Sequence, residues 1–347
     1  MSATGLHHPV HALGGHAMRR PAYTQINLVS DGSVPALQKD PNLVNAWGIS
    51  SGANTPFWVS SNGKGVSTLN NVFGTPQSLV VTIPAPTGAD STSAPTGQVF
   101  NNSSRTSDFH VGGVPARFLF ATEDGTIAAW ASGTTASLVV DNSAKGAIYK
   151  GLALGNTVNG SRLYATDFHN ARVDVWDGGF APVSLPAGAF TDPKIPAGFA
   201  PFGISNVGGN LVVTYAKQDS TGTDDVAGRG LGYVDIFDPN GNLIGRVGAR
   251  GSLNAPWGVA LAPAGFGRFS HDLLIGDFGD GRINAYRPVN GRYQFDGQLT
   301  GANGRALAID GLWGLQFGSN VGQPSVLYFA AGPNDESGGL FGAVAAT

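Results

Sequence analysis

Short apolar runs recur along the chain, and polar and turn-forming residues separate each run from the next. A glycine opens one of these runs six times, and the six glycines are Gly48, Gly97, Gly151, Gly203, Gly258 and Gly314. Their successive separations are 49, 54, 52, 55 and 56 residues. A repeat near 50 residues, with strand-forming residues in each unit, is typical of propeller blades. The pattern therefore predicts an all-β protein built from six repeated units.

The order of elements is the same within each repeat. A second apolar run follows each glycine-led strand, at residues 57–59, 118–120, 163–165, 211–213, 273–275 and 327–329. A turn then leads to a strand of alternating apolar and polar residues, clearest at 172–176 and 282–286. Turn residues at 289–291 precede an outer strand at 292–295. Four strands in each unit predict a six-bladed β-propeller with four-stranded blades.

The two ends of the chain are expected to close the ring. A strand at about 24–29 would supply the outermost strand of the last blade, beside the run at 340–344, and so remove an exposed sheet edge. We expect one propeller domain over residues 23–347 and a disordered tail over 1–22. That tail contains His7, His8, His11 and His16, for which a metal-binding cluster is the alternative interpretation.

The composition narrows the function classes. The chain has 52 Gly and 21 Pro among 347 residues, only 12% charged residues and a formal net charge of −3, so no basic surface for nucleic acid is expected. It has no cysteine, which excludes disulfides and thiolate chemistry. No apolar run reaches the length of a transmembrane helix. The make-up favours an extracellular or periplasmic protein without its signal peptide, with a cytoplasmic protein as the alternative.

Two segments share a motif of the form Asp-x-x-(Asn/Asp)-x-Arg-(Val/Ile), at residues 167–173 and 277–283. This motif resembles the NHL repeat. The resemblance implies that Asp167 with Arg172, and Asp277 with Arg282, form structural pairs in the turn between the second and third strands of their blades.

Longer segments resemble a whole family. They are residues 40–49, 215–219, 224–228, 255–260, 279–285, 309–315 and 331–336. Together they are similar to an uncharacterised bacterial and fungal family of conserved hypothetical six-bladed propellers, related to NHL-repeat proteins, over roughly residues 23–344. One departure is Gly338, where the family usually has a histidine. The resemblance implies the fold and no established activity.

Candidate chemistry is expected on one face of the propeller, where the loops between second and third strands lie. The six positions expected to end the second strands are Ser61, Glu123, Asp167, Tyr215, Asp277 and Ala331. A purely structural turn would tend to repeat one residue type. The variety at these positions therefore favours a site whose residues have different roles.

The loop at 217–230 concentrates charge in a chain that has little. It contains Lys217, Asp219, Asp224, Asp225 and Arg229. Carboxylate oxygens are ligands for hard cations such as Ca²⁺, so the loop is a candidate lid or cation-binding loop. A solvated surface loop is the alternative, because the spacing of an EF-hand is absent.

The corresponding loop of the last blade contains Asn334, Asp335 and Glu336. Two carboxylates can divide the acid and base roles if their surroundings separate their pKa values. His169 is the histidine of the propeller body that we expect to reach the same face, where it would move protons. A surface turn and a hydrogen-bonded turn histidine are the respective alternatives.

Three tryptophans, Trp47, Trp257 and Trp313, directly precede glycines of the repeat. Packing between neighbouring blades explains bulky apolar residues at such positions. A stacking rim for sugars or aromatic ligands is the functional alternative.

These observations favour a ligand-binding or interaction propeller, monomeric, with a small molecule or a protein as ligand and a divalent cation such as Ca²⁺ on the acidic face. The rival hypothesis is a Ca²⁺-dependent enzyme of the gluconolactonase type. Glu123, Asp277 and Glu336 would hold the metal, and His169, Asp167 or Glu336 would transfer the proton. A scaffold in an envelope or surface assembly is a further alternative.

Overall fold

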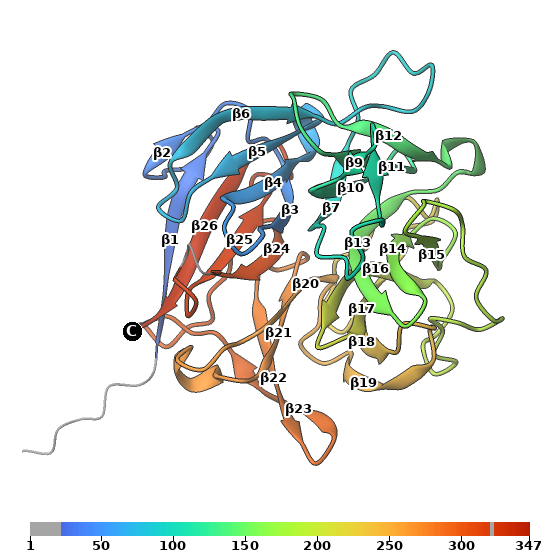
Figure 1. The fold of residues 1–347 in the computed structure, drawn as a ribbon. Helices are drawn as coiled ribbons and strands as arrows, with labels where there is room; N and C mark the ends of the chain where they lie inside the picture. Colours follow the sequence, from blue (N-terminus) through green and yellow to red (C-terminus); the bar gives the residue numbers. More distant parts are fainter. Residues whose placement is uncertain (1–21, 320–322) are drawn as a thin grey trace, which may run out of the picture.

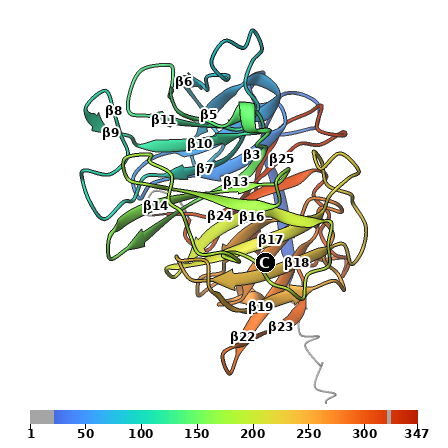
Figure 2. The ribbon, with the colours of Figure 1, turned by 90° about the vertical axis from the view of Figure 1, so that its right-hand side faces the viewer.

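The structure is a computed structural model that describes residues 22–319 and 323–347. The predictions for residues 1–21, including the four histidines, lie outside the described residues. Six small antiparallel sheets stand in a ring, and their innermost strands contact one another in the order β3, β7, β13, β16, β20, β24 and again β3 (Figure 1, Figure 2). The predicted six-bladed β-propeller is confirmed.

Each blade begins at the central axis. The innermost strands are β3 (Ala46–Ser50), β7 (Pro95–Phe100), β13 (Tyr149–Thr157), β16 (Phe199–Val207), β20 (Pro256–Leu261) and β24 (Leu312–Phe317). The second strands are β4 (Phe57–Ser61), β10 (Phe118–Thr122), β14 (Gly160–Asp167), β17 (Asn210–Lys217), β21 (Leu273–Asp277) and β25 (Leu327–Ala331). The third strands are β5 (Val66–Asn70), β11 (Thr126–Trp130), β15 (Arg172–Asp177), β18 (Gly232–Phe237), β22 (Ile283–Val289) and β26 (Leu340–Ala346).

The outer strands are β6 (Pro76–Thr82), β12 (Ser137–Asp141), β19 (Leu243–Ala249) and β23 (Arg292–Gln298), which complete blades one, two, four and five. The short strand β2 (Gln38–Lys39) adds to the edge of blade six, and β8 (His110–Val111) and β9 (Val114–Pro115) pair with each other outside the blades. Single 3₁₀ turns lie at Asn62–Lys64, Ser143–Lys145 and Gly267–Phe269. No helix among the described residues is long and apolar enough to span a membrane.

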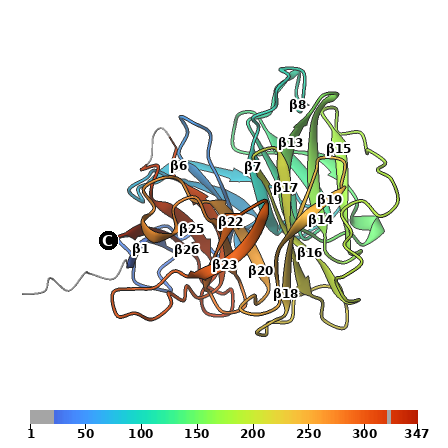
Figure 3. The same ribbon diagram turned by 90° about the horizontal axis from the view of Figure 1, so that it is seen from below.

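The first strand closes the ring as expected. β1 (Tyr23–Ser30) pairs antiparallel with β26, with Ile26 opposite Ala343, and so becomes the fourth strand of blade six. The two-residue strand β2 pairs parallel with the end of β1, so this sheet has five strands. Figure 1 shows the blue β1 beside the red β26, and Figure 3 shows the same junction from below. The closure covers the edge of the last sheet with the other end of the chain.

Blade three departs from the prediction of four strands per blade, because its sheet has only β13, β14 and β15. The segment after β15 makes a single bridge to it, between Trp176 and Pro182, with backbone hydrogen bonds from Asp177 N to Ala181 O at 2.9 Å and from Val183 N to Val175 O at 2.8 Å. Proline cannot donate a ladder hydrogen bond. Pro182 and Pro186 therefore keep this segment from continuing as a strand.

The six repeat glycines lie where neighbouring blades approach most closely. A Cβ atom added to any of them would lie too close to a backbone atom of the next blade. The distance between that Cβ and the nearest backbone atom would be 2.4 Å for Gly48 and Gly97, 3.0 Å for Gly151, 2.2 Å for Gly203, 2.5 Å for Gly258 and 2.6 Å for Gly314. The contacted residues belong in turn to β7, β13, β16, β20, β24 and β3. The repeat period therefore reports the close contact between innermost strands, which any larger side chain would separate.

Candidate functional site

Tryptophans from three blades fill one end of the central channel. The rings of Trp47 and Trp313 stack with centroids 3.6 Å apart, and Trp257 meets both of them edge-on, at 6.3 and 5.7 Å. Phe278 stacks on Trp313 at 3.9 Å. Trp47 and Trp313 are only 2% and 1% exposed. Their faces cover one another, so these two rings do not form the stacking rim considered from the sequence, and we call the group the aromatic plug.

Lys150 lies against this plug, at the start of β13. Its side chain is buried, and its ammonium lies 5.2 Å from the ring centroid of Trp47. The same ammonium donates to a carboxylate oxygen of Glu123 and, at 3.1 Å, to Asp224 Oδ1. Burial alone would lower the pKa of Lys150, but the two carboxylates outweigh it and raise that pKa. Lys150 is therefore charged.

Glu336 reaches the plug from the loop of blade six. Its Oε1 accepts a hydrogen bond from the Trp47 indole Nε1 at 3.2 Å, and the same N–H lies 2.9 Å from Asn45 Oδ1. Asn334, Asp335 and Glu336 all have positive φ angles, of 59°, 52° and 62°. Non-glycine residues pay for this conformation, and such backbone is found mainly where surrounding structure requires it. Here it turns the Glu336 carboxylate toward the channel axis.

Asp225 completes the group from the loop of blade four. Its Oδ2 is buried and has no hydrogen-bond partner among the described residues. Its pKa is raised to about 7, mainly because of burial; Lys150 opposes this rise, and the charges of Glu336 and Asp224 add to it. Burial also raises the pKa of Glu336. Both acids therefore resist ionisation in the folded protein.

We call this group the carboxylate–lysine cluster. Its members are Glu123, Lys150, Asp224, Asp225 and Glu336, and they come from blades two, three, four and six. One ammonium faces four carboxyl groups at the same end of the channel. Asn62 supports the group by donating to Glu123 Oε2 at 2.8 Å.

The cluster includes Glu123 because of a one-residue difference from the predicted register. Thr122, at the end of β10, pairs with Pro95, just as Asp277 pairs with Pro256 and Asp167 with Tyr149. Glu123 is therefore the residue after the equivalent position, and side chains alternate between the two faces of a strand. The prediction that Glu123 is equivalent to Asp167 and Asp277 is corrected.

Asp167 and Asp277 point into their own blades. Asp167 is fully buried, accepts from Asn170 Nδ2 at 2.8 Å and lies 3.2 Å from Arg172, so the expected structural pair is formed in blade three. Asp277 is also fully buried and accepts from Asn284 Nδ2 at 2.7 Å. Its expected partner Arg282 lies 3.7 Å from Asp280 instead. The structure thus brings Glu123 and Glu336 together, but not Asp277 with them.

Among the described residues, the remaining candidate side chains make no hydrogen bond or ion pair with the cluster. His169 is exposed, with Nδ1 3.3 Å from Gly222 O, and Lys217 Nζ lies 5.5 Å from the ring centroid of Phe199. Asp219 accepts from the hydroxyl of Thr221, which lowers its pKa, in contrast to Asp225 of the same loop.

The two residues before Glu336 are exposed. The backbone N–H of Asn334 donates to Asp310 Oδ2 at 2.9 Å, and Asp335 follows it in the same turn. Among residues 22–319 and 323–347, no group of three or more His, Cys, Asp or Glu side chains is arranged to hold a metal ion.

Lys150 was not selected from the sequence, although a signal was present. The residues that precede the six repeat glycines are Trp47, Thr96, Lys150, Phe202, Trp257 and Trp313. Four of them are aromatic. The lysine among them brings a positive charge to the end of the channel, and a comparison across the repeats would have found it.

Comparison with known proteins places the chain among uncharacterized relatives. No family model matches it. Two solved structures share the fold at low sequence identity. A protein of unknown function from Bacteroides thetaiotaomicron has a TM-score of 0.57 and 12% identity, with 94% of this chain and 76% of that chain covered. The apo form of the soluble aldose sugar dehydrogenase of Escherichia coli has a TM-score of 0.55 and 14% identity, with 93% of this chain and 99% of that chain covered.

At the level of sequence, an uncharacterized protein of Acanthamoeba polyphaga mimivirus is 32% identical over 331 residues, which cover 91% of this chain and 84% of that protein. The relatives found are thus viral rather than the expected bacterial and fungal proteins. The chain belongs to the family of uncharacterized six-bladed propellers that this mimivirus protein represents.

Proposed function

We propose that the protein is a ligand-binding propeller and that the carboxylate–lysine cluster binds the positively charged group of a small molecule. The observation that carries this proposal is the convergence of four carboxyl groups, from three blades, around the single ammonium of Lys150. A partly buried cluster with this imbalance attracts a second cation, since opposite charges stabilise the ionised carboxylates.

The raised pKa values support the same interpretation. Asp225, with a pKa of about 7, and Glu336 lack enough positive charge and hydrogen bonding to offset their burial. The partnerless Oδ2 of Asp225 is an acceptor without a donor. An ammonium or guanidinium group would donate to it and would return both pKa values toward their ordinary range.

Between an organic cation and Ca²⁺, the position of Lys150 favours the organic cation. Its ammonium already lies between Glu123 and Asp224, which a bound Ca²⁺ would use as ligands. Calcium would therefore have to displace Lys150 and gather several oxygens at 2.3–2.6 Å. Ca²⁺ is kept as the competing occupant of the same cluster.

Isothermal titration calorimetry distinguishes these cases. Agmatine and putrescine are the organic cations, CaCl₂ is the metal, and 1-butanol is a neutral control. The expected result is binding of at least one amine, with affinity that rises up to about pH 7 because Asp225 must lose its proton. Asp225→Asn should remove this pH dependence. Asp219→Asn, in the same loop but bonded to Thr221, is the matched control.

If only CaCl₂ gives heat, and this heat is lost in Asp225→Asn, the cluster binds Ca²⁺ and not an organic cation. The absence of heat from every cation at pH 6 to 8 would overturn the proposal. A protein ligand would then be sought on the same face.

A second candidate function is hydrolysis, which the pKa of Asp225 favours. A carboxyl group that titrates near pH 7 can donate and accept a proton at physiological pH. The neighbouring Glu336 would be the second acid–base group, as the sequence indicated. A panel of lactones and phosphoesters tests this candidate, with and without Ca²⁺. Activity that follows one ionisation near pH 7 and disappears in Asp225→Asn would support it, and turnover unchanged in that variant would refute it.

A further inference from the structure

A cavity lies on the opposite side of the aromatic plug from the carboxylate–lysine cluster. It occupies the central channel, has a volume of about 450 Å³ and reaches from the repeat glycines to the ends of the innermost strands. Trp257 belongs to its inner end, while Asn102, Leu261 and Phe317 belong to its mouth. The mouth therefore opens on the face opposite the carboxylate–lysine cluster. A volume of this size is in the range of small-molecule sites, which is about 300–1,000 Å³.

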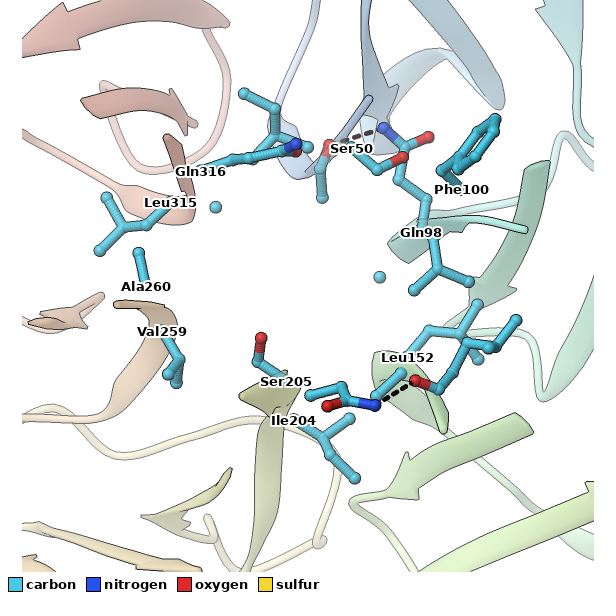
Figure 4. A pocket seen from close by; sticks show the side chains of 18 of the residues that line it. Ser50, Gln98, Phe100, Leu152, Ile204, Ser205, Val259, Ala260, Leu315 and Gln316 are labelled. Carbon is cyan, nitrogen blue, oxygen red and sulfur yellow. Dashed lines mark hydrogen bonds between the residues drawn. The ribbon is translucent and has the colours of Figure 1, made fainter. Parts of the chain in front are cut away.

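The described residues that line this cavity include no ionisable side chain. Figure 4 shows Leu152, Ile204, Val259 and Leu315 distributed around the channel, so that apolar surface comes from several blades. Charged groups are costly to transfer into such surroundings unless a partner charge is present. The lining therefore selects for uncharged molecules with an apolar part.

Polar atoms stand at separate points of the same wall. Ser50 is 7% exposed, lines the cavity, and its hydroxyl has no hydrogen-bond partner among the described residues. The hydroxyl of Ser205, from the blade opposite, points into the channel (Figure 4). Gln316 uses its Nε2 to donate to Ser51 Oγ at 2.8 Å.

Two other amides of the wall are occupied by the protein itself. Gln98 donates to Gly48 O at 3.2 Å and accepts from Ser67 Oγ at 3.1 Å, so both ends of its amide are used within the blades. Asn206 donates to Leu154 O at 2.8 Å. Among the described residues, the hydroxyls of Ser50 and Ser205 and, at the mouth, the amide of Asn102 make no such bond, so they are available to a ligand. A buried hydroxyl without a partner costs free energy, which a ligand hydroxyl at Ser50 would recover.

We propose that this channel is a binding site for an uncharged amphipathic molecule, with hydroxyl groups that bond Ser50 and Ser205 and an apolar part that packs on the aliphatic side chains between them. The stacked rings of Trp47 and Trp313 separate it from the carboxylate–lysine cluster. The two proposed ligands therefore differ in charge: the cluster binds a cation and the channel binds an uncharged molecule. Neither proposal depends on the other.

The probe for this site is n-octyl-β-D-glucoside below its micelle concentration, measured by calorimetry with the full chain. Octanoate and octylammonium, which have the same alkyl length but carry a charge, are the matched controls. The expected result is saturable binding of the glucoside alone, close to one molecule per chain. Equal binding of all three, or of none, would overturn the proposal.

Two variants locate the binding. Ser205→Phe fills open channel volume and should abolish the heat, whereas Ser107→Phe, at an exposed position of the chain, should not change it. Ser50→Ala removes one hydrogen-bonding group and should weaken binding about fivefold to tenfold. Circular dichroism and the melting temperature of each variant report whether it is folded. Glucoside binding that persists in folded Ser205→Phe would place the molecule elsewhere and refute the assignment.

Discussion

Replacing Gly203 by alanine tests the packing that sets the repeat period. A Cβ on Gly203 would lie 2.2 Å from the carbonyl oxygen of Trp257, 2.9 Å from its carbonyl carbon and 3.0 Å from Thr214 Oγ1. The first two atoms belong to the backbone of the next blade, so no side-chain rotation can make room. The innermost strands of blades four and five must separate by about 1 Å to reach ordinary van der Waals contact.

The expected cost follows from this overlap. Overpacking a well-packed core typically costs about 1–3 kcal/mol, and contact with a backbone atom places Gly203→Ala at or above the upper end of that range. The entropy of unfolding is about 0.7 kcal/mol/K for a chain of 347 residues. A destabilisation of about 3 kcal/mol therefore lowers the melting temperature by about 4 °C. The separation also moves Trp257, which contributes to the plug and to the end of the channel cavity.

Urea unfolding, followed by circular dichroism, measures the change in free energy. Gly245→Ala is the matched control, because a Cβ there meets no atom within 4 Å and β19 is an outer strand. Gly151→Ala should have an intermediate effect, because its nearest contact is at 3.0 Å. Equal stability of Gly203→Ala and Gly245→Ala would refute the explanation of the repeat glycines.

Two further predictions concern the carboxylate–lysine cluster. The pKa of Asp225 is about 7 in the folded protein and 3.8 for the ordinary group, so the folded state retains a proton that the unfolded state loses. The free energy of unfolding should therefore fall as the pH rises from about 4 to 7. Asp225→Asn should stabilise the protein at pH 8 by about 2–4 kcal/mol, which urea titration at each pH measures. Stability independent of this substitution at pH 8 would mean that Asp225 is well solvated. Lys150→Met leaves Glu123 and Asp224 without their ammonium and should cost about 2–3 kcal/mol, less than for a fully buried pair because Asp224 is exposed. The same variant should raise the pKa of Asp225 above 7, which ¹³C carboxyl titration by NMR measures; an unchanged pKa would show that Lys150 does not act on it.

The candidate site was only partly predictable, and Glu123 shows why. The sequence placed acidic residues of blades two, four and six on one face, and Glu123, Asp224, Asp225 and Glu336 do meet there. It also assigned Asp277 to the same site, but Asp277 and Glu123 differ by one residue in register. A shift of one residue moves a strand side chain to the other face, and the chain alone does not show where β10 ends.

The architecture could be predicted from the chain, because the repeat glycines, the paired apolar runs and the first strand each indicate the same six-bladed ring. A backbone contact that excludes a Cβ recurs once per blade and so appears as a period in the chain. Which groups share a site could not be predicted in this way, because it depends on contacts between blades. Lys150 and Glu336 are 186 positions apart, and both lie against Trp47 because the ring brings the starts of all six blades to one axis. That convergence also buries Asp225, and the burial raises its pKa. It brings Trp47 and Trp313 from different blades into the stack that divides the channel in two.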